Sequence, residues 1–148
     1  LQQAVAELEE AGLNITAVSP VYETDPVGGP EQGRFLNIVV GVDTWMPADE
    51  LLAMCHAVED MHGRTREVVW GPRTLDVDLL AYGSEVSESP DLLLPHPLAH
   101  QRAFVLVPWR DIAADFDVPG LGEVQDLADE VGTAGVRMVA ETLGAARR

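Results

Sequence analysis

The chain has 148 residues, a length that suits one compact domain built around a single hydrophobic core. Hydrophobic residues make up 47% of it, which excludes a disordered protein. The 25 acidic residues outnumber the 9 basic ones and give a formal net charge of -16, which excludes broad binding to nucleic acid or to an anionic membrane. All 9 basic residues are arginine, so a phosphate-binding loop that needs a lysine is excluded as well.

Cys55 is the only cysteine, so the chain forms neither an internal disulfide nor a cysteine-based zinc site. The apolar runs are only a few residues long, and the amino terminus lacks the basic and apolar segments of a signal peptide. We therefore expect a cytoplasmic protein. Because the helical pattern is already in progress at Leu1, which is not a methionine, we also expect residues before it.

The first half of the chain shows helical and strand patterns in alternation. Apolar residues at steps of three and four predict a helix from Leu1 to Ala11, with Gly12 at its end. β-Branched residues predict a strand over Ile15–Tyr22, and residues 25–30 follow as a turn rich in glycine and proline. Alternation predicts a second strand over Phe35–Thr44. The face of this strand that we expect to point into the core carries Leu36, Ile38, Val40 and Val42.

The central part of the chain continues with a helix from Pro47 to Gly63, which begins with a proline and two acidic residues and is followed by an aperiodic loop. Alternation then predicts a third strand over Thr74–Tyr82, and a short strand is expected near Glu85–Val86. A helix from Leu98 to Ala114 follows, which Pro108 would bend or interrupt.

Beyond residue 120 the sequence predicts one short helix over Val124–Val131 and a frayed tail over Val136–Leu143. The overall order of elements indicates an α+β sandwich with an antiparallel sheet. One further strand before Leu1 would complete a ferredoxin-like β-α-β-β-α-β unit, so we expect the first strand to lie outside this sequence. Residues 1–148 would then form a single domain.

Two aspartates, Asp76 and Asp78, are the strongest local chemical signal. Residues two apart on a strand point the same way and lie roughly 6.5 to 7 Å apart, so both carboxylates can converge on one or two divalent cations. Hard oxygen ligands favour Mg²⁺. The same pair is also compatible with the polar edge of an amphipathic strand.

Arginines gather around this pair. Residues 64–104 contain four arginines and only six acidic residues, whereas the rest of the chain contains five arginines and nineteen acidic residues. The four are Arg64, Arg66, Arg73 and Arg102. Arginines that bind phosphate oxygens beside carboxylates that bind a metal suit ATP with its Mg²⁺, although each arginine taken alone is equally typical of a surface ion pair.

Other side chains are candidates for ligand contacts. His96 lies between Pro95 and Pro97, which restrict the backbone and can aim the imidazole into a cleft, and a capping or surface role remains an alternative. An aromatic ring and an amide two residues apart, Phe35 and Asn37, can read a flat heterocycle, and Phe104 could supply a second ring. The alternative is that these are ordinary core and strand-end residues. The other histidines, His56, His62 and His100, are expected to be structural.

Five motifs, in order and spacing, resemble those of the 6-hydroxymethyl-7,8-dihydropterin pyrophosphokinase family of folate biosynthesis. They are V-Y-E-T-D-P at 21–26, F-L-N at 35–37, G-R-T-R at 63–66, W-G-P-R-T-L-D-V-D at 70–78, and L-P-H-P at 94–97 with R-A-F at 102–104. The resemblance covers about residues 1–120 and leaves 121–148 as a carboxy-terminal helix and tail. The sequence departs from the family at His56, where many members have glutamine.

The resemblance implies that the β,γ-pyrophosphoryl group of ATP is transferred to the hydroxymethyl oxygen of the pterin, releasing AMP. It implies that Asp76 and Asp78 hold two Mg²⁺ ions. It adds to these, as catalytic residues, Arg64, Arg66 and Arg73. The residues that it implies for pterin binding are Thr24, Val27, Phe35, Asn37 and Phe104. Those that it implies for nucleotide binding are Glu59, Trp70, Arg73, His96 and Arg102.

Two other functions remain compatible with the residues themselves. A metal-dependent phosphohydrolase would use the same aspartate pair, and a ferredoxin-like regulatory module would bind a ligand without turnover. In each case we expect small-molecule partners only, with no nucleic acid and no membrane, and a monomeric protein.

Overall fold

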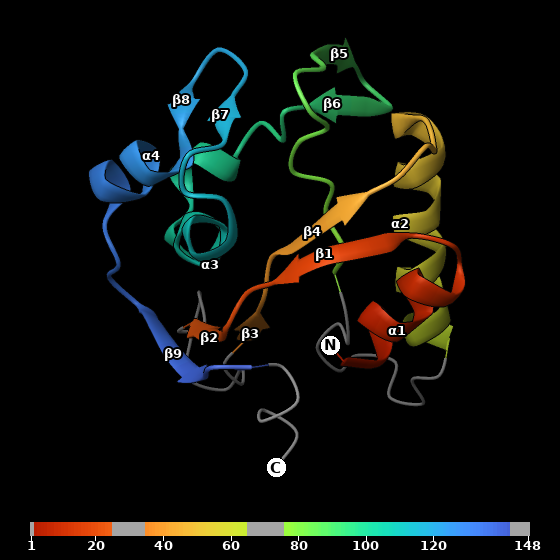
Figure 1. Ribbon diagram of the computed structural model, residues 1–148, viewed down its shortest axis with the longest axis horizontal. Helices are drawn as coiled ribbons and strands as arrows, with labels where there is room; N and C mark the ends of the chain where they lie inside the picture. Colours follow the sequence, from red (N-terminus) through yellow and green to blue (C-terminus); the bar gives the residue numbers. More distant parts are fainter. Residues whose placement is uncertain (1, 25–34, 65–75, 143–148) are drawn as a thin grey trace.

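In the computed structural model, the described residues are 2–24, 35–64 and 76–142, and the statements about structure below concern these residues. Helices α1 (Gln2–Glu10) and α2 (Ala48–Arg64) lie on one side of a pair of central strands, and α3 (Ala103–Ala113) and α4 (Val124–Val131) lie on the other (Figure 1). Small antiparallel sheets join these helices, so the predicted α+β class is confirmed.

The centre of the fold is one antiparallel hairpin bent in the middle. Strand β1 (Asn14–Val18) pairs with β4 (Val40–Asp43), and β2 (Val21–Thr24) pairs with β3 (Phe35–Asn37). Each of the two strands predicted in this region is therefore divided into two. The ladder is interrupted where Pro20, which has no backbone N–H to donate, follows Ser19.

Ser19 bridges the interruption with both its backbone and its side chain. Its backbone N–H donates to the Val39 carbonyl oxygen over 2.9 Å, and its Oγ accepts a 2.9 Å hydrogen bond from the Val39 N–H. The same hydroxyl donates to the Pro20 carbonyl oxygen over 2.8 Å. Ser19 is only 1% exposed, so these bonds satisfy polar groups that water does not reach.

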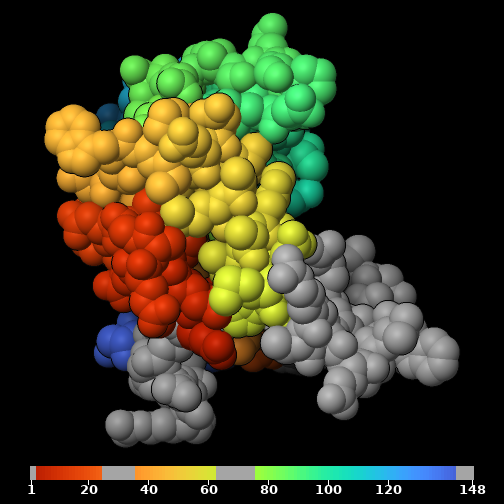
Figure 2. Space-filling model, turned by 90° about the vertical axis from the view of Figure 1, so that its right-hand side faces the viewer, coloured from red at the N-terminus to blue at the C-terminus, as the bar shows by residue number. Residues whose placement is uncertain are grey.

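Two apolar clusters pack against the bent hairpin, one on each side. The first lies between α3, α4 and the hairpin and contains Val39, Ala99, Leu106, Trp109, Val118, Val124, Leu127 and Ala128. The second lies between α1, α2 and the hairpin and is formed by Ala4, Leu8, Leu13, Leu51 and Val58. Figure 2 shows the outer face of this second layer, with α1 in red beside α2 in yellow.

The prediction of a single core face for residues 35–44 is therefore wrong in part. Val42 packs against the second cluster as expected, but Leu36 is 48% exposed. Val39, which was assigned to the opposite face, is buried in the first cluster. Both faces of the hairpin are covered by helices, and the bend at residues 38–39 breaks the simple alternation of a flat strand.

The strand predicted over Thr74–Tyr82 does not form in its described part, residues 76–82, because none of the described strands pairs with it. Its side chains nevertheless reach both layers: Val77 and Leu79 pack against the second cluster, and Leu80 packs against the first. The 76–82 segment therefore runs between the two clusters. Its Leu80 carbonyl accepts a 2.8 Å hydrogen bond from the His96 N–H.

A hairpin of β5 (Ser87–Ser89) and β6 (Leu92–Leu94) follows, slightly beyond the strand expected near residues 85–86. The predicted helix over 98–114 is divided into a short 3₁₀ turn, η1 (Ala99–Gln101), and α3, and Pro108 lies inside α3 without ending it. Two-residue strands, β7 (Asp117–Val118) and β8 (Gly122–Glu123), lead into α4, which matches its prediction.

The prediction of a frayed tail over 136–143 is wrong for β9 (Val136–Ala140). This strand pairs antiparallel with β2, so the sheet order is β3-β2-β9. An ion pair of 3.0 Å between Arg137 and Glu23 joins the two strands. The open edge of β2 supplies a hydrogen-bonding partner that no local pattern around residue 136 reveals. In the described part of the chain, no helix is long and apolar enough to span a membrane.

The Ser19→Ala substitution tests the bend. It leaves the Val39 N–H buried without its side-chain acceptor, and we expect the free energy of unfolding to fall by about 1–3 kcal/mol. Urea denaturation measures the change, with Ser84→Ala as a control because Ser84 lies exposed in a turn. Equal stability of the two variants would contradict a structural role for the Ser19 hydroxyl.

Candidate functional site

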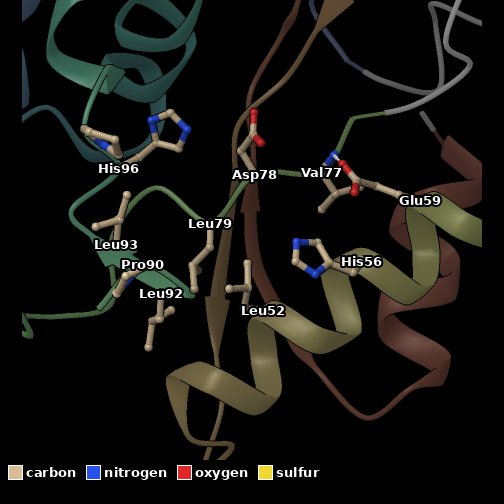
Figure 3. A pocket seen from close by; sticks show the side chains of 11 residues that line it. Leu52, His56, Glu59, Val77, Asp78, Leu79, Pro90, Leu92, Leu93 and His96 are labelled. Carbon is tan, nitrogen blue, oxygen red and sulfur yellow. Dashed lines mark hydrogen bonds between the residues drawn. The ribbon is translucent and has the colours of Figure 1, made fainter. Parts of the chain in front are cut away.

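A pocket of about 240 Å³ lies between α2, the 76–82 segment and the β5–β6 hairpin with the residues after it (Figure 3). Its polar residues come from all three parts: His56 and Glu59 from α2, Asp78 from the segment, and His96 from the turn after β6. The other lining residues are apolar and include Leu52, Val77, Leu79, Leu92 and Leu93. An apolar cavity with a few polar groups is typical of a small-molecule site.

Asp78 presents a carboxylate for which the described residues supply no hydrogen bond and no ion pair. Asp76, two residues earlier, is exposed as Asp78 is. The described residues contain no group of three or more potential metal-ligating side chains. Two carboxylates without further protein ligands suit Mg²⁺, which binds through one or two carboxylates and takes its remaining oxygens from water and phosphate.

Glu59 holds the backbone between these two aspartates. Its Oε2 accepts a hydrogen bond of 2.7 Å from the N–H of Val77. The helix α2 carries Glu59 one turn after Cys55, on the side of the helix that faces the 76–82 segment (Figure 3).

The negative charges of Glu59 and Asp78 act on the thiol of Cys55. Cys55 is buried, and burial raises its pKa to about 11, with the negative charges of Glu59 and Asp78 adding to the increase. The thiol therefore stays protonated near neutral pH, which disfavours a nucleophilic role for Cys55.

His96 is oriented by two backbone contacts. Its N–H donates to the Leu80 carbonyl, and its ring Nδ1 accepts a 3.2 Å hydrogen bond from the Leu98 N–H. A neutral imidazole that accepts at Nδ1 carries its proton at Nε2. His96 therefore can offer an N–H donor at Nε2 to a ligand oxygen in the pocket.

A second group of predicted residues lies where β2 and β3 meet α3. Asn37 donates a side-chain hydrogen bond from Nδ2 to Thr24 Oγ1. In the first turn of α3, the guanidinium of Arg102 lies over the ring of Phe104, 5.5 Å from its centroid. Helix α3 contacts both β2 and β3.

Tyr22 links the strands of this region to α3. It is buried, lies opposite Asn37 in the β2–β3 ladder, and donates a hydrogen bond from its hydroxyl to Asp111 Oδ2. Burial raises the pKa of Tyr22 to about 12, and the hydrogen bond and the negative charge of Asp111 act in the same direction. No sequence pattern indicates this contact, because Tyr22 reads as one more alternating strand residue.

Several predicted site residues lie outside the described residues, namely Val27, Arg66, Trp70 and Arg73. Phe35 is described as part of β3 and Arg64 as the end of α2, but their side chains lie outside the description. The structure thus brings together Glu59, Asp78 and His96. It also adds His56 to the pocket wall, where the sequence predicts a structural histidine. Its spacing of three residues from Glu59 on α2 is the signal that could have found it.

Comparison with known proteins finds similar proteins over the region of the chain that contains the pocket. The model of the family described as 7,8-dihydro-6-hydroxymethylpterin-pyrophosphokinase matches residues 1–114. The chain is similar to three proteins named 2-amino-4-hydroxy-6-hydroxymethyldihydropteridine pyrophosphokinase.

In Bacillus subtilis (strain 168), identity is 47% over 113 residues, which cover 76% of this chain and 68% of the relative. For the relative in Pseudomonas aeruginosa, identity is 44% over 105 residues, which cover 71% of this chain and 65% of the relative. For the relative in Mycobacterium tuberculosis (strain H37Rv), identity is 47% over 114 residues, which cover 70% of this chain and 60% of the relative. The matched segment therefore spans about two thirds of the length of these relatives.

The Tyr22→Phe substitution tests the link between β2 and α3. Loss of the hydrogen bond should lower the free energy of unfolding by about 1 kcal/mol near neutral pH. Because the pKa of Tyr22 is higher in the folded protein than its ordinary 10.0, its stabilising contribution is complete below pH 10 and is lost as pH rises through about 12.

Chemical denaturation across this alkaline range measures the effect. The wild-type protein should lose stability more steeply than Tyr22→Phe. Parallel curves for wild type and Tyr22→Phe would show that the Tyr22 hydroxyl does not contribute as described.

Proposed function

The chain belongs to the 7,8-dihydro-6-hydroxymethylpterin-pyrophosphokinase family, and from this membership we propose that it transfers pyrophosphate from ATP to 6-hydroxymethyl-7,8-dihydropterin in folate biosynthesis. The family that the sequence motifs resemble is thereby confirmed. The observation that carries the proposal is the family match over residues 1–114, which includes the pocket that Glu59, Asp78 and His96 line. ATP is the co-substrate, and the products are AMP and the pterin diphosphate.

The group transfer exchanges one phosphorus–oxygen bond for another. The hydroxymethyl oxygen of the pterin forms a bond to the β-phosphorus of ATP, and the bond from that phosphorus to the oxygen bridging the α-phosphate breaks. AMP leaves with the bridging oxygen, and the hydroxyl proton passes to water. No oxidant or reductant is needed, so the protein has mainly to bind and orient the two substrates.

We assign Asp76 and Asp78 as ligands of two Mg²⁺ ions. This assignment is supported by the exposure of both carboxylates and by the place of Asp78 in the pocket wall. When bound, Mg²⁺ offsets the charge of the triphosphate and of the leaving group. The two aspartates would hold the ions on the exposed side of the 76–82 segment, at the rim of the pocket.

The pocket itself is proposed to take the nucleoside part of ATP. Its apolar walls suit a base, and His96 would donate from Nε2 to a nucleotide oxygen. Arg102 would contact a phosphate, and its position over the Phe104 ring limits the directions in which its guanidinium can point. Further nucleotide contacts are proposed for Glu59, Trp70 and Arg73.

The pterin is proposed to bind where β2 and β3 meet α3. Asn37 uses its amide N–H on Thr24, which leaves its carbonyl oxygen to accept from an N–H of the heterocycle. Phe104 and Phe35 would stack on the ring, and Val27 would complete the site. The catalytic arginines, Arg64, Arg66 and Arg73, remain predictions from the family motifs.

The broader organisation is also a proposal. Residues 1–148 would act as one pyrophosphokinase domain with a ferredoxin-like sandwich, in the cytoplasm. A monomer is sufficient, because the site as proposed draws every residue from one chain. Outside the family match, α4 and β9 would complete the domain rather than supply substrate contacts.

A turnover assay tests the proposed activity. With ATP, Mg²⁺ and the hydroxymethyl-dihydropterin, we expect AMP to form only when the pterin is present. Phosphate released without pterin would instead identify a phosphohydrolase. Binding of ATP without any turnover would identify a ligand-binding module.

The Asp78→Ala substitution tests the metal assignment. We expect turnover to fall by at least about 100-fold, because the charge that develops on the phosphates loses its metal-mediated stabilisation. The fold should remain intact, since removing one of two neighbouring carboxylates relieves their repulsion in the metal-free protein.

Asp43→Ala is the matched control, because Asp43 is an exposed aspartate at the end of β4, outside the pocket. It should keep wild-type turnover. Full activity in Asp78→Ala would overturn the metal assignment.

A further inference from the structure

The 76–82 segment carries both aspartates. Among the described residues it forms no strand ladder. Its contacts to the rest of the protein are separate ones: the Leu80 carbonyl bonds to the His96 N–H, and the Tyr82 hydroxyl donates to the Met46 carbonyl over 2.5 Å. Both lie on the carboxy-terminal side of Asp78, away from the end of the segment that carries the aspartates.

The Glu59 carboxylate supplies the contact at that end. Its 2.7 Å hydrogen bond goes to the N–H of Val77, the residue between Asp76 and Asp78 (Figure 3). A bond from a backbone N–H to an ionised carboxylate is short and strong compared with one between neutral groups. Glu59 itself is carried by the 17-residue helix α2, which packs through Leu51 and Val58 into the second cluster.

Because Val77 lies between Asp76 and Asp78, the hydrogen bond to Glu59 affects the orientation of both aspartate side chains. In an extended backbone, neighbouring side chains point to opposite sides, and those two apart point to the same side. The Val77 side chain packs against the second cluster, and the residues on either side of it, Asp76 and Asp78, are both exposed. Rotation of the backbone at Val77 would turn one carboxylate away from the other.

The hydrogen bond that Glu59 accepts from the backbone argues against treating this residue only as a contact for a ligand. One of its carboxylate oxygens, Oε2, is engaged with the backbone before any substrate binds. A glutamine has a side-chain carbonyl at the same position and can accept the same hydrogen bond without the charge. The two possible actions of Glu59, through a backbone hydrogen bond or through its charge, can therefore be separated.

We propose that Glu59 is a positioning residue, which presets the two aspartates for metal binding by holding the Val77 N–H. This inference rests on the proposed function in so far as Asp76 and Asp78 are the metal ligands. It assigns to Glu59 a role in the free protein, in addition to the nucleotide contact expected from the family motifs.

The test compares two substitutions of similar size, Glu59→Gln and Glu59→Met. The first keeps a hydrogen-bond acceptor, and the second keeps the length and the helix preference but has no carbonyl to accept. Mn²⁺ serves as the probe, with its affinity measured by electron paramagnetic resonance in the presence of a non-hydrolysable ATP analogue. Amide hydrogen exchange at Val77, followed by NMR without metal or nucleotide, reports on the hydrogen bond itself.

We expect Glu59→Met to lose the exchange protection of the Val77 amide and to weaken Mn²⁺ binding by about 10–100-fold, the range for substitutions that disturb the support of metal ligands. Glu59→Gln should keep the protection and bind Mn²⁺ within a few-fold of wild type. Asp60→Ala is the control for charge, because it removes one negative charge from the neighbouring exposed position of α2. It should match wild type in both measurements.

Two results would overturn the proposal: Mn²⁺ affinity in Glu59→Met equal to wild type, or losses of equal size in Glu59→Gln and Glu59→Met, which would show that Glu59 acts through its charge. Should Glu59→Met fail to fold by circular dichroism, Glu59→Ala replaces it with the same expectations. Asp78→Ala separates this proposal from the proposed function. If it too keeps wild-type Mn²⁺ affinity, the metal assignment itself fails, whereas loss in Asp78→Ala alone overturns only the role of Glu59.

Discussion

The site depends on how the 76–82 segment, for which the described residues supply no strand partner, is held between two apolar layers. The Val77 side chain anchors residues 76–82 to the layer of α1 and α2, and Leu80 anchors them to the layer of α3 and α4. The hydrogen bond from Val77 to Glu59 then sets the backbone between the two aspartates. Carboxylates that carry like charges repel each other, so presenting them side by side requires support of this kind.

The helices were predictable because their apolar residues recur at helical spacing and pack against one layer only. The strands were less so. Pro20 divides a ladder that the sequence pattern predicts as continuous. Val39 and Val42 pack against opposite clusters, which removes the difference between the two faces on which alternation depends. Strand β9 depends on the edge of β2, more than a hundred residues earlier, and pairing at that distance leaves no trace in the local pattern.

The chemistry of the site was easier to predict than its support. Asp78 and His96 could be chosen because their residue types and neighbours are unusual in themselves, and the structure brings both to one pocket. The contacts that hold the site are different in kind. Glu59 to Val77 and Tyr22 to Asp111 join residues 18 and 89 apart, and each pairs a common side chain with a partner that only the fold supplies.

The central claim is that the chain moves two phosphates together to the pterin. The most direct test of this claim uses ATP with a radioactive β-phosphate and follows where the label goes. We predict that, in the presence of Mg²⁺ and the pterin, the label leaves the nucleotide and appears in the pterin product, while the nucleotide product is unlabelled AMP. Label retained in ADP, or released as inorganic phosphate without the pterin, would contradict pyrophosphoryl transfer.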